Sequence, residues 1–258
     1  MIAFFARRRA LILGILSLVA LVGTWQLLVD FGFIDAFFVS TPRAVAEEFL
    51  IQYDRGTITT HVLATLHSFV LAFGLAVFVG VGLGVLASSS RDVEAGLEPF
   101  IWFKYSAPTV AFYPLFIAWL GYGTPTIVAI AFLFALTPIY ANTLSGIRNV
   151  DPDLVAAARS FGARPHDIFF QVALPGSVPT VLAGLRLGAG RALTGVVVAE
   201  LFGANAGLGY SIAYFAQLLQ TTRMMVSIVM VILLGVLLTQ ILSFIEGKTE
   251  AWRLASRS

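Results

Sequence analysis

Residues 151–175 read DPDLVAAARSFGARPHDIFFQVALP and lie between two long apolar segments. Asp151 suits the N-cap of a helix, Pro152 its first position, and Asp153 the positive end of the helix dipole. Gly162 follows at a place where a glycine commonly ends a helix. The stretch therefore predicts a first short helix that begins after Asp151 and ends at Gly162.

A second short helix is predicted over the rest of this stretch. Pro165 suits its start, Asp167 lies in its first turn, and Leu174-Pro175 is expected to end it. Apolar residues recur at helical spacing in both helices, at Leu154, Val155, Ala158 and Phe161 and at Ile168, Phe169 and Val172. Two amphipathic helices beside a membrane must bury these faces, either against the protein itself or against a partner.

The chain around this stretch is too apolar for a soluble domain. Its 258 residues are 59% hydrophobic and 12% charged, whereas soluble domains average about 45–50% and about 25%. Five stretches without Asp, Glu, Lys or Arg run to 20, 35, 43, 22 and 22 residues. A membrane-spanning helix needs about 20 mostly apolar residues. The composition therefore indicates an integral membrane protein.

Glycine, proline and amide content separates spans from loops within the charge-free stretches. The 43-residue stretch is divided by the turn Gly121-Tyr122-Gly123-Thr124-Pro125, and residues 203–222 are expected to form a loop with a short helix. The sequence predicts one all-α membrane domain over residues 1–258, with residues 146–177 as a loop after the fourth span. Its six transmembrane helices are expected at about 10–29, 61–87, 98–120, 125–145, 178–201 and 224–245.

The first predicted span resembles a signal peptide because its apolar run follows three arginines. Its apolar run of about 20 residues exceeds the 7–15 residues usual there, and Trp25-Gln26-Leu27-Leu28 offers no small-x-small cleavage site. An uncleaved helix is therefore favoured over a cleaved one.

Lysine and arginine set the expected orientation. Only Arg43, Arg55 and Arg223 lie on the side opposite to residues 146–177. Ten basic residues fall on the same side as that loop: Arg7, Arg8, Arg9, Arg91, Arg148, Arg159, Arg164, Lys248, Arg253 and Arg257. The asymmetry predicts a multi-pass protein with both termini and residues 146–177 in the cytoplasm.

The loop sequence resembles the EAA loop of ABC-importer permeases. That family pattern is Glu-Ala-Ala, three residues, Gly, nine residues and Ile-x-Leu-Pro; here Val172 replaces the Ile and Ala156 replaces the Glu. The matching positions are Ala157, Ala158, Gly162, Leu174 and Pro175. Further similar segments are Ser40-Thr41-Pro42, Pro114-Leu115-Phe116-Ile117-Ala118-Trp119, Gly184-Leu185-Arg186, Val197-Val198-Ala199-Glu200 and Gly207-Leu208-Gly209-Tyr210. Together they resemble the nitrate/sulfonate/taurine/bicarbonate branch of binding-protein-dependent type I importers.

The resemblance implies a permease subunit in a bacterial plasma (inner) membrane, with the type I importer permease fold. It implies a second permease copy, an ATP-binding cassette subunit that holds ATP and Mg, and an extracytoplasmic protein that delivers a small anionic solute. The paired cytoplasmic helices would couple the permease to the ATPase subunit. The expected coupling residues are Asp153, Ala156, Ala157, Ala158, Arg159, Phe161, Gly162, Leu174 and Pro175.

Charged and kinking residues within the spans are candidates for the translocation pathway. A charge at the bilayer centre costs from about 2.5 to more than 10 kcal/mol, so such residues normally face a bundle interior or a wet cavity. Arg191 either lines the pathway and attracts an anion or ties a helix end to a neighbour or to lipid headgroups by snorkelling. For Arg186 the second role, a tie to a neighbour or to lipid headgroups, is favoured. Glu200 is expected near the outer mouth. Pro114, with Pro108, is expected to kink the third span.

Small residues indicate where helices approach closely. Gly80 and Gly84 in the second span, and Gly184 and Gly188 in the fifth, have the G-x-x-x-G spacing. Close packing is the favoured role for all four, ahead of contact with a substrate.

No catalytic, cofactor or metal site is predicted in this chain. Its lack of cysteine excludes disulfides and thiolate chemistry. Gly247-Lys248-Thr249 is not a P-loop, because Leu242 stands where the motif needs its first glycine. A net charge of +2 gives no reason to expect nucleic acid as a partner. The alternatives are an intramembrane enzyme, for which no cluster of catalytic groups is evident, and a channel or secondary transporter that needs no ATPase.

Overall fold

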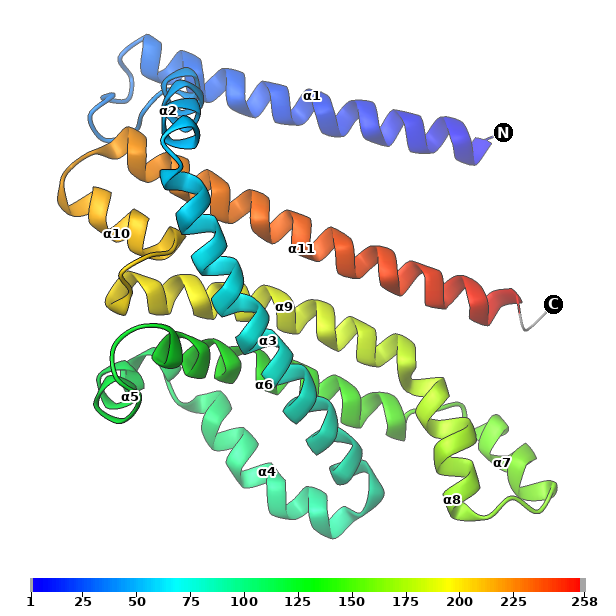
Figure 1. Cartoon of the computed structure of the whole chain (residues 1–258). Coiled ribbons are helices and arrows are strands. Elements are labelled where there is room, and N and C mark those ends of the chain that lie inside the picture. The colour runs from blue at the N-terminus through cyan, green and yellow to red at the C-terminus, as the bar shows by residue number, and fades with distance from the viewer. Residues whose placement is uncertain (1, 256–258) are drawn as a thin grey trace.

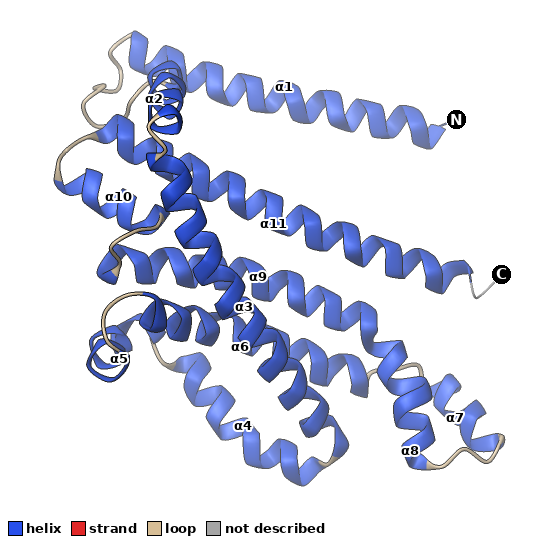
Figure 2. Ribbon diagram, in the orientation of Figure 1, coloured by secondary structure: helices blue, strands red, loops and turns tan. Residues whose placement is uncertain are grey.

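The structure is a computed structural model that describes the backbone of residues 2–255, and the side chains of residue 9 and of residues 12–247. Within residues 2–255 it consists of helices and connecting loops, with no strand (Figure 2). In chain order these elements are α1 (Ile2–Asp30), α2 (Pro42–Asp54), α3 (Thr57–Ser89), α4 (Arg91–Ser106), η1 (Thr109–Phe112), α5 (Tyr113–Leu120), α6 (Thr124–Arg148), α7 (Pro152–Ser160), α8 (Pro165–Ile168), η2 (Phe169–Ala173), α9 (Leu174–Gly203), α10 (Leu208–Gln217) and α11 (Thr221–Ala255). The all-α prediction is confirmed.

Five helices of the described chain are long and apolar enough to cross a membrane. They cover Ile12–Asp30, Thr57–Ser89, Thr124–Arg148, Pro165–Gly203 and Thr221–Gly247. These helices correspond to five of the six predicted spans. The predicted loop over residues 203–222 contains one short helix, α10, as expected.

The third predicted span, 98–120, is wrong as a single helix. Helix α4 ends at Ser106, a short 3₁₀ turn follows, and α5 begins at Tyr113. The break lies at Ala107, which is extended with ψ 132° because it precedes Pro108. Pro114 lies in the first turn of α5, where a proline is well tolerated, so it starts a helix instead of kinking one.

The second predicted short helix does not end at Leu174-Pro175. Helix α8 passes through the π-helical segment η2 directly into α9, so that residues 165–203 form one helical run. The Leu174 N–H donates to the Phe169 carbonyl in this wider turn. A wider turn accommodates a proline that lacks an N–H and would otherwise collide with the preceding turn.

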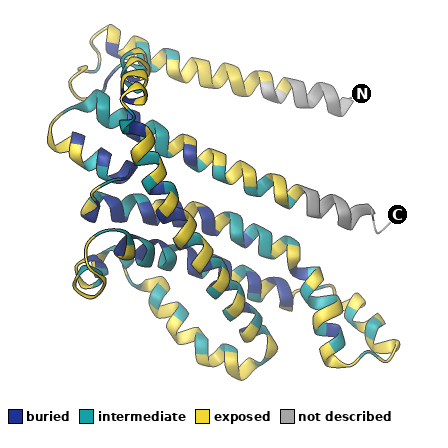
Figure 3. Cartoon of the chain, viewed as in Figure 1, coloured by how far each residue is buried: buried dark blue, intermediate teal, exposed yellow. Residues whose placement is uncertain are grey.

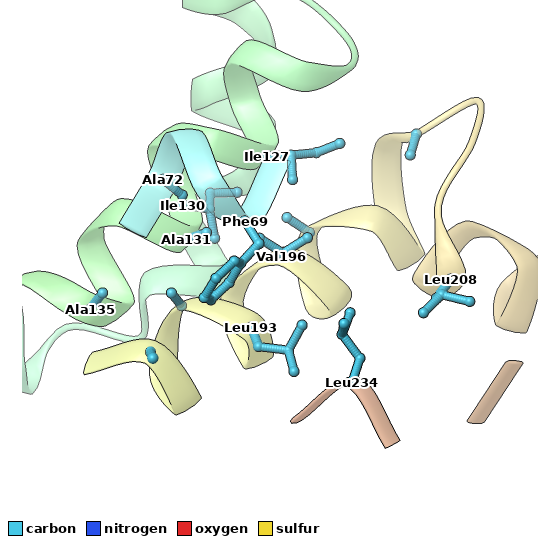
Figure 4. Packing of buried hydrophobic residues seen from close by; sticks show 14 of the residues in the cluster. Phe69, Ala72, Ile127, Ile130, Ala131, Ala135, Leu193, Val196, Leu208 and Leu234 are labelled. Carbon is cyan, nitrogen blue, oxygen red and sulfur yellow. The ribbon is translucent and has the colours of Figure 1, made fainter. Parts of the chain in front are cut away.

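Helix α6 is the centre of the bundle and packs most extensively on α9 and α3. Figure 4 shows the core between these helices, where Phe69 and Ala72 of α3 meet Ile130, Ala131 and the residues of α9. Figure 3 shows the buried residues concentrated in α6 and α9 and the exposed ones along α1 and α4. Outward-facing apolar residues on the long helices are what a surrounding bilayer requires.

Glycines bring α3 and α9 into close contact with α6. A Cβ on Gly84 would lie 2.6 Å from Thr143, and one on Gly188 would lie 2.5 Å from Ile139. The same holds for Gly80 and Gly184, whose Cβ atoms would meet α6 side chains at 2.9 and 2.5 Å. The packing role predicted from the G-x-x-x-G spacing is confirmed for all four.

The two ends of the bundle carry different elements (Figure 1). The start of α1, the end of α11 and the α7–α8 hairpin lie at one end, whereas α2, α10 and α5 lie at the other. The start of α1 and the end of α11 therefore lie on the same side as residues 146–177, and the cytoplasmic location of the termini stays a prediction. Arg7, Arg8, Lys248, Arg253 and Arg257, on which the cytoplasmic orientation partly rests, fall outside the described side chains.

Candidate functional site

Helix α7 has well-formed caps at both ends. The Asp151 side chain accepts a hydrogen bond from the Asp153 N–H at 3.0 Å, which satisfies an otherwise unpaired donor of the first turn. At the other end the Gly162 N–H donates to Arg159 and the Ala163 N–H to Ala158, at 2.9 and 3.1 Å. This pair of bonds is a Schellman motif, and Gly162 provides the left-handed φ of +80° that it needs. The predicted cap and stop signals are confirmed.

The hairpin formed by α7 and α8, called the α7 hairpin from here on, presents an apolar tip. The side chain of Phe161 is 92% exposed, which is the largest exposure of any bulky apolar residue in the described part of the chain. Leu154 on α7 and Phe170 on η2 are half exposed. Only Val155 and Ala158 face partly inward, where α7 packs on η2. An exposed aromatic residue on a capped, polar helix at the end of the bundle is typical of a docking surface.

The predicted coupling residues separate by exposure. Asp153, Ala156, Ala157, Arg159, Phe161, Gly162 and Pro175 are exposed, and Ala158 and Leu174 are partly buried. A groove of about 480 Å³ lies between the end of α6 and α7, and both Ala156 and Arg159 line it. The hairpin therefore gathers these residues at one end of the molecule, and the continuous helix through η2 ties them to α9.

A polar cavity of about 460 Å³ lies between α4, α6 and α9 at mid-length of the bundle. Arg191 of α9 and Lys104 of α4 both line it, and Lys104 donates a hydrogen bond to the Thr137 hydroxyl at 3.0 Å. The rest of its lining consists of Tyr105, Thr109, Phe134, Thr137, Pro138 and Ala141. Pro114, in contrast, is exposed on α5.

Glu200 is 1% exposed and is held inside the chain. Its carboxylate accepts hydrogen bonds from the Thr65 hydroxyl at 2.9 Å and from the Gly209 N–H at 2.8 Å. The Thr65 oxygen in turn accepts the Leu208 N–H at 2.8 Å. His61 accepts the Gly207 N–H at 3.2 Å. These contacts join α3, the end of α9 and the start of α10, so that Glu200 holds the loop over residues 204–207 in place.

Arg186 ties two long helices together. Its guanidinium lies 2.9 Å from a carboxylate oxygen of Glu246, which joins α9 to α11. The favoured role of Arg186 as a tie to a neighbour is confirmed. Similar ion pairs join Arg223 to Glu48, at 3.1 Å between α11 and α2, and Arg148 to Glu94 between α6 and α4.

Lys104 and Thr65 are the site residues that the sequence did not reveal. Lys104 marks only the edge of a charge-free stretch in the sequence, and its partner Thr137 is 33 residues away. Thr65 is 135 residues from Glu200. Both separations are too long to appear as a helical periodicity in the sequence. Only the packing of α3, α4, α6 and α9 brings these groups together.

A bundle of apolar helices with a capped, exposed hairpin at one end is typical of a multi-pass membrane protein with a docking surface for a partner. The chain belongs to the family of binding-protein-dependent transport system inner membrane components, which residues 76–250 match. It is a permease subunit rather than an enzyme.

Relatives cover nearly the whole chain. The putative aliphatic sulfonates transport permease protein SsuC of Bacillus subtilis is 32% identical over 240 residues, which are 93% of this chain and 87% of that protein. The taurine transport system permease protein TauC of Escherichia coli is 29% identical over 249 residues, 95% of this chain and 90% of that protein. These similarities confirm the family resemblance seen in the sequence.

Solved structures share the fold. The MetNI methionine ABC transporter, in an inward-facing conformation, matches with a TM-score of 0.68 at 17% identity, over 77% of this chain and 98% of that chain. An amino acid ABC transporter matches with a TM-score of 0.63 at 18% identity, over 78% and 96%. The type I importer permease fold predicted from the sequence is confirmed.

Proposed function

We propose that the chain carries a small organic anion of the sulfonate class across a bacterial inner membrane, driven by an ATP-binding subunit that docks on the α7 hairpin. The observation that carries the proposal is the continuous helical run from α8 through η2 into α9, which begins at the exposed hairpin and continues to Arg191. Movement of a docked hairpin is transmitted directly to a helix that lines the polar cavity. The names of the sulfonate and taurine relatives supply the substrate class.

A second copy of the chain completes the pathway in this proposal. Arg191 is exposed in a single copy although it lies far from both ends of α9. A charge at that depth needs a wet cavity or a protein partner rather than lipid. Pairing of two copies across this face encloses Arg191 and the polar cavity, and the expected assembly is a homodimer with two ATP-binding subunits.

The proposed function also sets the orientation of the chain in the membrane. The end that carries α7 and both termini faces the cytoplasm, where ATP is available. The opposite end, with α2, α10 and α5, faces the extracytoplasmic protein that delivers the solute. The greater number of Lys and Arg on the α7 side supports this orientation.

Reconstitution tests the proposal against a channel or secondary transporter. The chain, its ATP-binding subunit and its solute-binding protein are placed in liposomes, and uptake of a radiolabelled alkanesulfonate is measured with ATP. Uptake is expected to stop when the ATP-binding subunit carries an inactivating substitution. Uptake that continues with the inactive subunit contradicts the proposal and favours a transporter that needs no ATPase.

The docking step has its own matched pair of variants. Phe161→Ala removes the apolar tip of the hairpin, whereas Phe33→Ala removes a phenylalanine that is 78% exposed near the opposite end. Phe161→Ala is expected to lower the amount of ATP-binding subunit that copurifies with the chain, and Phe33→Ala to leave it unchanged. Equal copurification with both variants would show that the tip is not a docking contact.

A further inference from the structure

Two cations at the middle of the bundle have no carboxylate partner among the side chains that the structure describes. The ion pairs among the described side chains use Arg43, Arg148, His166, Arg186 and Arg223. Lys104 and Arg191 take part in none of them, and both line the cavity between α4, α6 and α9. No Asp or Glu is among the residues that line this cavity, all of which lie in the described part of the chain.

The depth of the two cations makes their lack of a carboxylate partner significant. Arg191 lies 17 residues after Leu174 and 12 before Gly203, which is about 25 Å and about 18 Å from the two ends of α9. Lys104 bonds to Thr137, which lies near the midpoint of α6. An ionisable side chain at such depth is rare and normally has a partner that offsets the loss of water. The arginines that tie helix ends, by comparison, each have a glutamate.

Lys104 lines this cavity from the last turn of α4, just before the helix breaks. Helix α4 stops at Ser106, two residues before Pro108, and the chain turns through η1 toward α5. Lys104 is therefore in the last turn of α4, where its side chain reaches across to α6. Lys104 before the break and Thr109 after it therefore line the same cavity as Arg191.

The remaining walls suit a small oxyanion with a short apolar part. A guanidinium offers paired N–H donors that match a carboxylate or sulfonate, and an ammonium adds a compact charge. Tyr105, Thr109 and Thr137 carry hydroxyl groups, and Phe134 contributes an apolar ring. The volume of about 460 Å³ falls within the range of about 300–1,000 Å³ typical of small-molecule sites.

We propose that this cavity is a binding site for the transported anion inside the permease, in which Lys104 and Arg191 hold the charged group and Tyr105 and Phe134 contact its apolar part. The proposal rests on the transport function proposed above. It makes the permease itself, and not only the delivering protein, selective for negative charge. It also assigns Lys104, on α4, a role equal to that of Arg191.

Direct binding to the permease complex tests the site. The chain and its ATP-binding subunit are reconstituted in nanodiscs of phosphatidylcholine, and binding of ethanesulfonate is titrated, with the uncharged ethyl methyl sulfone as a control for shape. Lys104→Gln and Arg191→Gln are each expected to weaken ethanesulfonate binding about tenfold or more, because each removes a charge-assisted bond. Lys104→Arg is expected to retain binding. Arg55→Gln, an exposed cation beyond the end of α2, serves as the matched control and is expected to bind like the unchanged chain.

The outcomes separate the anion site from its alternatives. Unaltered binding in both Gln variants, absence of binding by the unchanged chain, or equal binding of the sulfone overturns the proposal. Displacement of ethanesulfonate when phosphatidylglycerol is added also overturns it, because the cavity then belongs to a lipid headgroup. Copurification of the ATP-binding subunit is scored on every sample. If the ATP-binding subunit does not copurify with the unchanged chain, this result contradicts the proposed function and not the anion site.

Discussion

Replacement of Glu200 tests how the loop at the outer end of the bundle is held. In Glu200→Ala the Thr65 hydroxyl and the Gly209 N–H both lose their acceptor in a buried region. A buried polar group left without a partner costs about 1–3 kcal/mol, so the two together predict a loss of about 2–6 kcal/mol in the free energy of unfolding. Glu200→Gln keeps the volume and one acceptor oxygen, and about half of that loss is expected.

The assay combines stability with local exchange. Thermal unfolding in detergent is compared with that of Thr194→Val, which removes a hydroxyl from an exposed position on the same helix, where it bonds only to the Gly190 carbonyl. Hydrogen exchange is expected to speed up at residues 204–210 in Glu200→Ala and to stay slow in Thr194→Val. If Glu200→Ala unfolds and exchanges like the Thr194→Val control, the carboxylate does not hold the loop and the reasoning is refuted.

Two further predictions concern glycines. Gly188→Ala places a Cβ 2.5 Å from the Ile139 side chain and is expected to destabilise the bundle by about 1–3 kcal/mol, measured by thermal unfolding. Gly190→Ala is the control, because a Cβ at this position of the same helix would meet open space. Equal unfolding of the two variants would contradict the close contact between α6 and α9. Gly162→Ala forces a φ of +80° on a residue with a Cβ, at a cost of about 1–2 kcal/mol to the hairpin alone. It is expected to reduce copurification of the ATP-binding subunit without lowering the unfolding temperature of the bundle, and an unchanged copurification would contradict a need for the tight turn.

Local signals in the sequence were sufficient for most of the fold. The caps of α7 at Asp151 and Gly162 are short-range features, and the structure has them as predicted. Long charge-free stretches likewise predicted four of the membrane-length helices, α1, α3, α6 and α11, because a bilayer sets a minimum length for a span. The fifth, α9, was also predicted although it carries Arg186, Arg191 and Glu200. The G-x-x-x-G spacing is also a short-range feature, and it predicted the close approach of helices at Gly84 and Gly188.

The errors arose where a proline could be accommodated in more than one way. Pro108 breaks the third passage because its neighbour becomes extended, whereas Pro175 follows a π-helical turn and lets the helix continue. The sequence gives no local signal of the wider turn at η2, which packs against α7 in the structure. The site was harder still, because the approach of Lys104 to Thr137 and of Thr65 to Glu200 depends on tertiary contacts between separate helices.

The absence of cysteine from the chain allows the central claim to be tested by a single cross-link. Ala156→Cys on α7 and Ala46→Cys on α2 introduce one thiol each at exposed alanines on opposite ends of the bundle. Each variant is labelled with a short photoactivatable maleimide in membranes that contain the complete transporter. The account predicts a cross-link to the ATP-binding subunit from residue 156 and none from residue 46. A cross-link from residue 46, with none from residue 156 whether ATP is present or absent, would contradict it.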